Sequence, residues 1–232
     1  MSRYTWLLDP GHGGIIDGEY QTVGKRSPTL PDGTILYEGV FNREIVTRII
    51  ALCYEVGRKD LGWQFDAQTR IEYGWTAQTR VEICDPVINL VDTNEDMSLN
   101  RRVDKANRIH QKNGNSIYVS IHANAFGDGK DFNSANGIGT FHHYQSTSGK
   151  KLAEVLQPHL VAKSGLRDRG VVANDKWANF YVLRKTNMPA ILSENGFMTN
   201  LNDAEALMTD EMKQKIAEAH FAMMLEIEEN GL

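Results

Sequence analysis

The chain has 232 residues, of which 41% are apolar, and it carries a formal net charge of −5 at pH 7. Domains typically contain about 150 residues, so one enlarged domain with a substantial core is expected rather than two. The acidic balance and the absence of a basic run argue against a nucleic-acid partner. No apolar stretch approaches the ~18 residues of a membrane span, and the chain passes after Arg3 directly into a strand without the apolar h-region of a signal peptide, so neither membrane insertion nor a Sec-type export signal is expected.

The first strand is expected over residues 4–8, which are β-branched, aromatic or apolar and therefore suited to burial on both faces. Pro10-Gly11 and Gly13-Gly14 then predict a turn around His12. The small neighbours leave the His12 ring accessible to solvent or to a metal. A turn histidine without a function is the alternative, and His12 alone does not distinguish the two.

A helix is expected over residues 41–56, with Glu38 just ahead of its start. Its apolar side chains recur every three or four positions and form one stripe: Ile45, Val46, Ile49, Ile50, Leu52, Cys53 and Val56. Cys53 is expected to be a core thiol, and two cysteines are too few for a disulfide framework. A glutamate at a helix start commonly interacts with the macrodipole, so capping is the alternative to a functional role for Glu38.

Two further strands are expected to end at polar side chains. Residues 117–121 form a short strand pattern that ends before His122, and residues 189–192 form an apolar run that ends before Glu194. Open α/β sheets place their ligands at the carboxyl ends of strands, so both positions are candidates for a site. A carboxylate directly after an apolar strand is costly to bury unless a cation or a proton donor pairs with it.

The rest of the chain alternates strands with helices. Ser98 is expected to cap a helix that runs through Lys112, and Ser148 is expected to begin another that Pro158 bends or ends. Asn202 is expected to open a short helix and Thr209 to open the last one. This order predicts an α/β fold: a single three-layer domain whose twisted, largely parallel sheet is flanked by helices, with the active site at the carboxyl ends of the strands.

Four of these residues together point to one kind of chemistry. Two imidazoles and one carboxylate are a common ligand set for a catalytic zinc, which keeps a fourth position open for water. A further carboxylate can then handle protons. The combination of two histidines and two glutamates therefore predicts a metal-dependent hydrolase; the residues are His12, Glu38, His122 and Glu194.

Several motifs of this chain occur in the order found in one known family. They are Asp9-Pro10-Gly11-His12-Gly13-Gly14, the pair Glu38 and Asn42, Ser120-Ile121-His122-Ala123-Asn124, Gly137-Ile138-Gly139-Thr140-Phe141, Tyr181-Val182-Leu183-Arg184, and Pro189-Ala190-Ile191-Leu192-Ser193-Glu194-Asn195-Gly196-Phe197-Met198-Thr199-Asn200. In these motifs the chain resembles the zinc-dependent N-acetylmuramoyl-L-alanine amidases of the amidase-3 type, which act in bacterial cell-wall remodelling and in phage lysis. The resemblance runs from residue 7 to about residue 227.

The resemblance implies a reaction and a role for each site residue. His12, Glu38 and His122 fall on the family's zinc ligands, with one Zn²⁺ per chain, and Glu194 falls on its catalytic glutamate. The bond cut would be the amide that joins the lactyl group of N-acetylmuramic acid to L-alanine in peptidoglycan. Asn42 matches a recurrent position, for which a helix-start hydrogen bond is favoured over substrate contact.

Two long segments depart from the family pattern. One catalytic domain over residues 1–232 is expected, with insertions near residues 15–37 and 58–89. Their aromatic side chains would offer flat faces to sugar rings or peptide; the alternative is that the segments cover an exposed edge of the sheet or pad the core. The aromatic residues are Tyr20, Trp63, Tyr73 and Trp75. Arg184 would contact a substrate carboxylate or form a surface ion pair.

Two alternatives to the amidase interpretation are a zinc peptidase that cuts within the stem peptide and a catalytically inactive wall-binding module. The expected partner is peptidoglycan, and the expected oligomeric state is a monomer. Because no export signal is seen, the protein is expected to be made in the cytoplasm and to act on the cell wall. A phage or prophage endolysin released with a holin fits this expectation, and a bacterial enzyme without its signal segment fits it almost as well.

Overall fold

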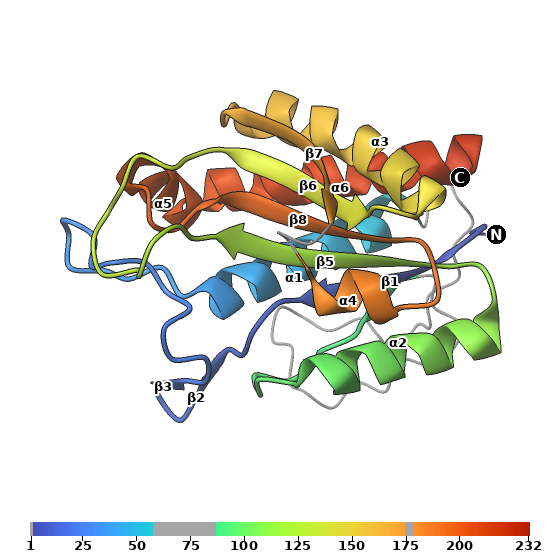
Figure 1. Cartoon of the computed structure of the whole chain (residues 1–232), viewed down its shortest axis with the longest axis horizontal. Helices are drawn as coiled ribbons and strands as arrows, with labels where there is room; N and C mark the ends of the chain where they lie inside the picture. Colours follow the sequence, from blue (N-terminus) through green and yellow to red (C-terminus); the bar gives the residue numbers. More distant parts are fainter. Residues whose placement is uncertain (1, 58–86, 175–178) are drawn as a thin grey trace.

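The computed structural model describes residues 2–57, 87–174 and 179–232. Within these residues six strands form one sheet in the order β4-β1-β5-β8-β6-β7, with helices on both of its faces (Figure 1). The strands are β1 (Thr5–Pro10), β4 (Val87–Asn89), β5 (Ser116–Asn124), β6 (Ile138–His143), β7 (Asp168–Asn174) and β8 (Ala190–Phe197). β6 and β8 pair antiparallel and the other neighbours pair parallel, so the predicted α/β fold with a largely parallel sheet is confirmed.

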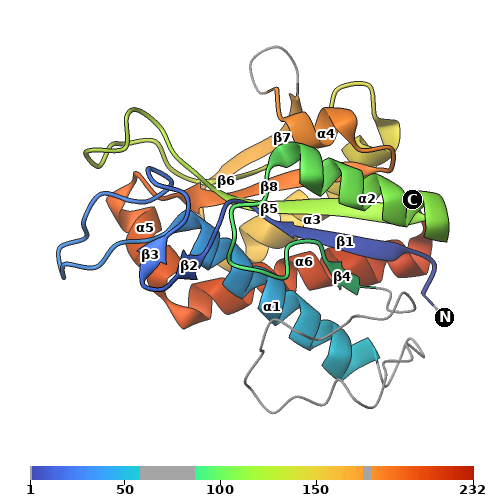
Figure 2. The ribbon, with the colours of Figure 1, turned by 90° about the horizontal axis from the view of Figure 1, so that it is seen from below.

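The helices of the described residues divide between the two faces. They are α1 (Glu38–Gly57), α2 (Leu99–Asn113), α3 (Thr147–Ser164), α4 (Tyr181–Lys185), α5 (Leu201–Met208) and α6 (Asp210–Asn230). α6 packs against both α1 and α3 on one face, while α2 packs against α4 on the other (Figures 1 and 2). In the part of the chain that the structure describes, no helix combines the length and apolarity needed to cross a membrane.

Successive side chains of a strand point to opposite faces of the sheet, and this alternation decides which side chains of the central strands lie on the face covered by α2 and α4. Tyr118 of β5 and Leu192 of β8 belong to the apolar cluster under α2 and α4, whereas their strand neighbours belong to the larger core under α1, α3 and α6. Side chains two or four residues apart in a strand share a face. His122 therefore lies on the face of Tyr118, and Glu194 lies on the face of Leu192. Both candidate site residues thus point to the same side of the sheet.

The loops at the carboxyl edge of β1 and β5 gather at one end of the molecule. β2 (Ile15–Ile16) and β3 (Glu19–Tyr20) form a small antiparallel hairpin there. The loop that leaves β5 and the helix α5 lie at the same end (Figure 1). This end is the edge at which the candidate site is built.

Three local predictions need correction. α3 begins at Thr147 after the cap Ser146 and continues through Pro158, because the proline ring is on the exposed side of the helix while Leu156 and Leu160 stay buried. α5 is capped by Asn200 rather than by Asn202. The predicted caps at Ser98 and Thr209 are confirmed, since each side chain accepts a hydrogen bond from a backbone N–H of the following turn.

β8 is longer than its apolar run predicts. The strand continues from Leu192 through Glu194 to Phe197, so the glutamate lies inside the strand rather than after its end. Its backbone neighbours are His122 on β5 and Gly139 on β6. A charged side chain is tolerated at this inner position because it opens into a cavity instead of the apolar core.

Candidate metal site at the carboxyl edge of the sheet

The structure brings three of the predicted site residues together. Nε2 of His12 lies 3.2 Å from Oε2 of Glu38, and Nδ1 of His122 lies 2.9 Å from Oε1 of the same carboxylate. One nitrogen or oxygen from each of the three side chains fits within 4.8 Å of the others. Among the described residues this is the one such group of three histidines, cysteines or carboxylates.

Glu38 is placed by the start of α1, of which it is the first residue. Its carboxylate is 2% exposed and also accepts a hydrogen bond from the backbone N–H of Ala123 at 3.3 Å. Burial raises the pKa of Glu38, but hydrogen bonds and positive charge from His12 and His122 outweigh it and lower the pKa to about 2. The contacts with both histidines therefore favour the carboxylate form of this buried side chain.

The donor set fits a divalent metal ion. Two imidazole nitrogens with a carboxylate are a ligand set that suits zinc and leaves a coordination position free. The close approach also depends on Gly11, where a Cβ atom would collide with the ring of His122. A side chain at position 11 would thus push His122 out of the group.

Glu194 faces the same site from the neighbouring strand. It pairs with His122 across β5 and β8, it is 8% exposed, and its Oε2 has no hydrogen-bond partner among the described residues. Burial raises the pKa of Glu194 to about 8, with the Glu38 charge adding to the increase and His122 and Lys25 opposing it. An unbonded carboxyl oxygen beside a potential metal site is available for proton transfer.

The turn that carries His12 is held by its backbone. His12 has a φ of +64°, a left-handed conformation that is unfavourable for residues other than glycine. Its carbonyl oxygen accepts hydrogen bonds from Nη1 of Arg43 at 2.8 Å and from Nη2 of Arg102 at 3.1 Å. Two cationic donors on one carbonyl offset the cost of the strained turn and fix the ring above Glu38.

Arg102 is itself anchored by a buried carboxylate. Its Nη1 lies 2.6 Å from Oδ1 of Asp9, and both side chains are almost fully buried. The other carboxylate oxygen accepts from the hydroxyls of Tyr118 at 2.6 Å and Ser120 at 2.9 Å. Burial raises the pKa of Asp9, but the Arg102 charge and the Tyr118 hydrogen bond hold it below its ordinary value. No sequence motif indicated the pairing of Asp9 with Arg102, although a carboxylate inside an apolar strand predicts a buried cationic partner.

Replacing Arg102 with methionine is expected to cost about 3–5 kcal/mol of unfolding free energy, because Asp9 is then left as an unpaired buried charge. Arg101→Met is the matched control, since Arg101 is exposed, and it should change the stability by less than about 0.5 kcal/mol. Urea unfolding of the three proteins measures the difference. Equal stability of Arg102→Met and the wild type would show that the ion pair does not hold this turn.

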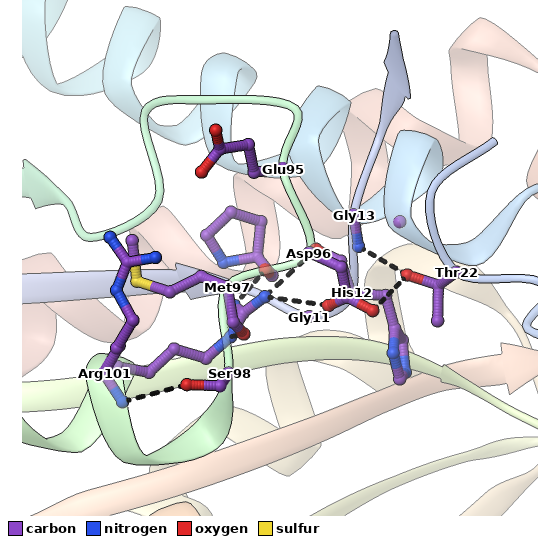
Figure 3. Close-up of polar contacts among 12 residues, drawn as sticks. Gly11, His12, Gly13, Thr22, Glu95, Asp96, Met97, Ser98 and Arg101 are labelled. Atoms are coloured by element: carbon purple, nitrogen blue, oxygen red, sulfur yellow. Dashed lines mark hydrogen bonds and ion pairs between the residues drawn. The ribbon is translucent and has the colours of Figure 1, made fainter. Parts of the chain in front are cut away.

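The far side of the turn is fixed by the loops next to it. The backbone N–H of Gly13 donates to Oγ1 of Thr22 at 2.8 Å, and that hydroxyl donates to Asp96 at 2.7 Å (Figure 3). Asn42 is fully buried, and its side chain donates to the carbonyl of Gly11 at 3.1 Å. Asn42 thus supports the turn instead of making the expected helix-start hydrogen bond.

A buried hydrogen-bond chain connects α6 with the backbone of His122. Nδ1 of His220 lies 2.8 Å from the carbonyl of Ile216, so it carries the proton, and Nε2 accepts from the hydroxyl of Ser193 at 2.9 Å. The side-chain amide of Asn195 donates to Ser193 at 3.0 Å and to the carbonyl of His122 at 2.9 Å. This series of hydrogen bonds runs from α6 through β8 to β5 and fixes the strand that carries the candidate ligand.

His220 is expected to make the protein less stable as the pH falls. Burial lowers the pKa of His220 to about 4, so between this value and the unfolded pKa of about 6.5 only the unfolded chain takes up the proton. The contribution of His220 to the free energy of unfolding is fully present above pH 6.5, and about 2 kcal/mol of that contribution is lost at pH 5. In His220→Asn the loss of unfolding free energy between pH 7 and pH 5 should be smaller by that amount, since all other titrating groups are shared. An NMR titration that finds a pKa near 6.5 for the wild-type ring would contradict the prediction.

The site opens into a cavity of about 800 Å³. His12, Glu38, His122 and Glu194 all line it, and its other walls come from the start of α2, from β6 and from α4. Lys25 also lines it, which the sequence analysis missed. Arg184 and Tyr20 do not line it: Arg184 stands over the Tyr181 ring, and Tyr20 stacks on another tyrosine. Trp63, Tyr73 and Trp75 lie outside the described residues, so their predicted contact with substrate stays a prediction.

A three-layer α/β sheet with a His, Glu and His group at its carboxyl edge, beside a free carboxylate, defines a class of protein suited to metal-assisted hydrolysis. The sequence matches the Amidase_3 family, N-acetylmuramoyl-L-alanine amidase, over residues 78–226. The matched range contains His122 and Glu194. His12 and Glu38 precede it in the sequence, and the fold brings them to the same site. The chain belongs to the Amidase_3 family.

Individual proteins agree with this assignment. The chain is 32% identical over 230 residues, 96% of its length, to an uncharacterised cell wall amidase of Bacillus anthracis, of which it covers 35%. It is 42% identical over 124 residues, 53% of its length, to the N-acetylmuramoyl-L-alanine amidase LytC of Bacillus subtilis, of which it covers 23%. The crystal structure of an N-acetylmuramoyl-L-alanine amidase from Clostridium difficile 630 matches with a TM-score of 0.71 at 27% identity, covering 100% of both chains. The chain thus spans between about a quarter and a third of these two curated relatives.

Proposed function

We propose that this chain is a zinc-dependent N-acetylmuramoyl-L-alanine amidase that hydrolyses the amide between N-acetylmuramic acid and L-alanine in peptidoglycan. The observation that carries the proposal is the group of His12, Glu38 and His122 with Glu194 beside it in one cavity. Membership of the amidase family supports the choice of bond. We further propose that the chain is one catalytic domain that works as a monomer.

In this proposal His12, Glu38 and His122 hold one zinc ion. When bound, zinc supplies a Lewis acid for the scissile carbonyl and lowers the pKa of a water molecule. Glu38 contributes the anionic ligand, because its position at the helix start holds a buried carboxylate beside both histidines before substrate arrives. The two histidines contribute neutral nitrogen donors from loops and strands of the same sheet edge.

Glu194 is the proton-transfer group. Its unbonded Oε2 accepts a proton from the attacking water while the water oxygen bonds to the carbonyl carbon. The carbon–nitrogen bond then breaks, and Glu194 gives the proton to the leaving amine of L-alanine. The carboxylate form needed for the first step is favoured by the positive charges of His122 and Lys25, which oppose the burial and the Glu38 charge that raise its pKa.

The test uses the purified full chain and purified sacculi. Turnover should release stem peptides with a free N-terminal alanine, a chelator should stop it, and added zinc should restore it. New amino groups other than that of L-alanine would identify a peptidase instead. Bound zinc without release of any new amino group would favour an inactive wall-binding module.

We propose that the wall is also the place of action, which the relative named as a cell wall amidase supports. The choice between a phage and a bacterial setting stays a prediction. A holin gene next to the coding sequence would favour lysis, and a division or sporulation cluster would favour remodelling.

A further inference from the structure

Among the described residues, Lys25 is a cation without an ion-pair partner in a cavity whose other cations have partners. Arg102 is held by Asp9 at 2.6 Å, and both site histidines contact Glu38. Lys25 lines the same cavity, but its Nζ lies within 4 Å of no carboxylate oxygen in the described ranges. It acts on Glu194 only through space. A positive charge next to the reacting centre is thus available to a ligand.

The backbone of Lys25 is fixed although its side chain is exposed. The carbonyl oxygen accepts hydrogen bonds from the backbone N–H of Glu38 at 3.0 Å and from the hydroxyl of Tyr20 at 2.9 Å. The Tyr20 hydroxyl in turn accepts from the N–H of Gly39 at 2.9 Å. These bonds tie residue 25 to the first turn of α1, beside the proposed metal ligand. Anchoring the backbone reduces the entropy lost when the side chain binds an anion.

The opposite wall of the cavity is apolar and aromatic. Phe141 of β6 and Phe180 before α4 meet edge to face with ring centroids 5.1 Å apart, and Tyr181 follows. This wall belongs to the α2/α4 face of the sheet, whereas Lys25 is attached to α1 on the other face. The cavity is therefore lined by the cationic Lys25 near α1 and by an aromatic cluster on the α2/α4 face, and the candidate metal ligands line it as well.

The proposed substrate has the same asymmetry. The lactyl carboxyl of the muramoyl group is consumed in the scissile amide, so the sugar side of that bond is neutral. The stem peptide on the other side carries carboxylates, the first of them on the residue after L-alanine. We propose that Lys25 binds a carboxylate of this second residue, which directs the peptide toward α1 and the sugar toward the aromatic wall. The inference rests on the proposed amidase function and names a subsite within it.

The test compares a charged and a neutral substrate. N-acetylmuramoyl-L-alanyl-D-glutamate carries the carboxylates, and its diamide replaces both with amides of similar size. The wild-type kcat/KM should favour the charged substrate by about 10-fold, mainly through KM, and this preference should shrink as salt is added. In Lys25→Met the preference should fall to about one, and Lys25→Arg should restore most of it.

Arg26→Met is the matched control, because it removes an adjacent exposed cation that does not line the cavity. It should keep the wild-type preference. Zinc content and melting temperature are measured for every variant, so that loss of the metal or of the fold is seen independently of turnover.

Each other outcome has a definite meaning. Equal losses on both substrates in Lys25→Met, or no loss on either, would overturn the carboxylate subsite while leaving the amidase proposal intact. Zinc-loaded wild type that cleaves neither sacculi nor these substrates would instead overturn the amidase proposal, and the subsite with it. If only sacculi are cleaved, inhibition of that reaction by L-alanyl-D-glutamate and by its diamide supplies the same comparison, and equal inhibition would overturn the subsite.

Discussion

Replacing His12 or His122 with alanine is expected to remove bound zinc and hydrolytic activity together. Each variant leaves one imidazole and one carboxylate, and two protein ligands hold zinc poorly. Glu38 would also lose one of the two histidine contacts that stabilise its buried charge, at 3.2 Å from His12 and 2.9 Å from His122. Elemental analysis after dialysis should fall from near one zinc per chain to near zero, and release of stem peptides from sacculi should fall to background.

His159→Ala controls for loss of a histidine as such. His159 lies on α3 and pairs with Glu226 of α6, away from the cavity. The variant should keep its zinc and its activity. If His12→Ala and His122→Ala both stayed near one zinc per chain, the proposed ligand set would be wrong.

Strand geometry explains why residues scattered along the sequence lie together in the structure. β1 and β5 are adjacent and parallel, so the residues that follow them arrive at one edge of the sheet. Apolar runs identified both strands, and that was enough to bring His12 and His122 together. The position of Glu38 could be predicted only approximately, because helix periodicity does not show where the first turn of a helix packs relative to the sheet.

Hydrogen bonds and ion pairs between residues far apart in the sequence could not be predicted. Arg102 meets Asp9 across a separation of 93 residues, and Asn195 reaches the carbonyl of His122. Local periodicity carries no information on such pairs, although the cost of burying Asp9 predicts that a partner exists. Arg184 and Lys25 show the same limit: both are cations near expected site elements, and only the fold shows that Lys25 lines the cavity.

Strand and helix ends were less predictable than their existence. β8 runs past Glu194 because its backbone pairs on both sides, with β5 and β6, whatever the side chain there. α3 runs past Pro158 because flanking apolar residues stay packed against the sheet and α6. In both cases tertiary packing outweighed a local sequence signal that favours the end of the strand or helix.

Replacing Glu194 with glutamine is expected to leave zinc and fold in place and to lower turnover on sacculi by about 100-fold or more. Glutamine keeps the volume of the side chain but cannot take the proton of water and return it to the leaving amine. The free Oε2 of Glu194 means that no hydrogen bond to a described residue is lost there. Burial raises the pKa of Glu194 to about 8 although the charges of His122 and Lys25 oppose it, so the variant also removes a group that titrates close to neutral pH.

The measurements are zinc content, melting temperature and the pH dependence of kcat/KM. Glu205→Gln, the same change at an exposed position on α5, should match the wild type in all three. In the wild type, protonation of Glu194 should lower kcat/KM at acid pH. The residual kcat/KM of Glu194→Gln should lack this decrease. Loss of zinc from Glu194→Gln would make Glu194 a ligand and would contradict the division of roles with Glu38, because a proton-transfer group beside the metal is not needed to hold it.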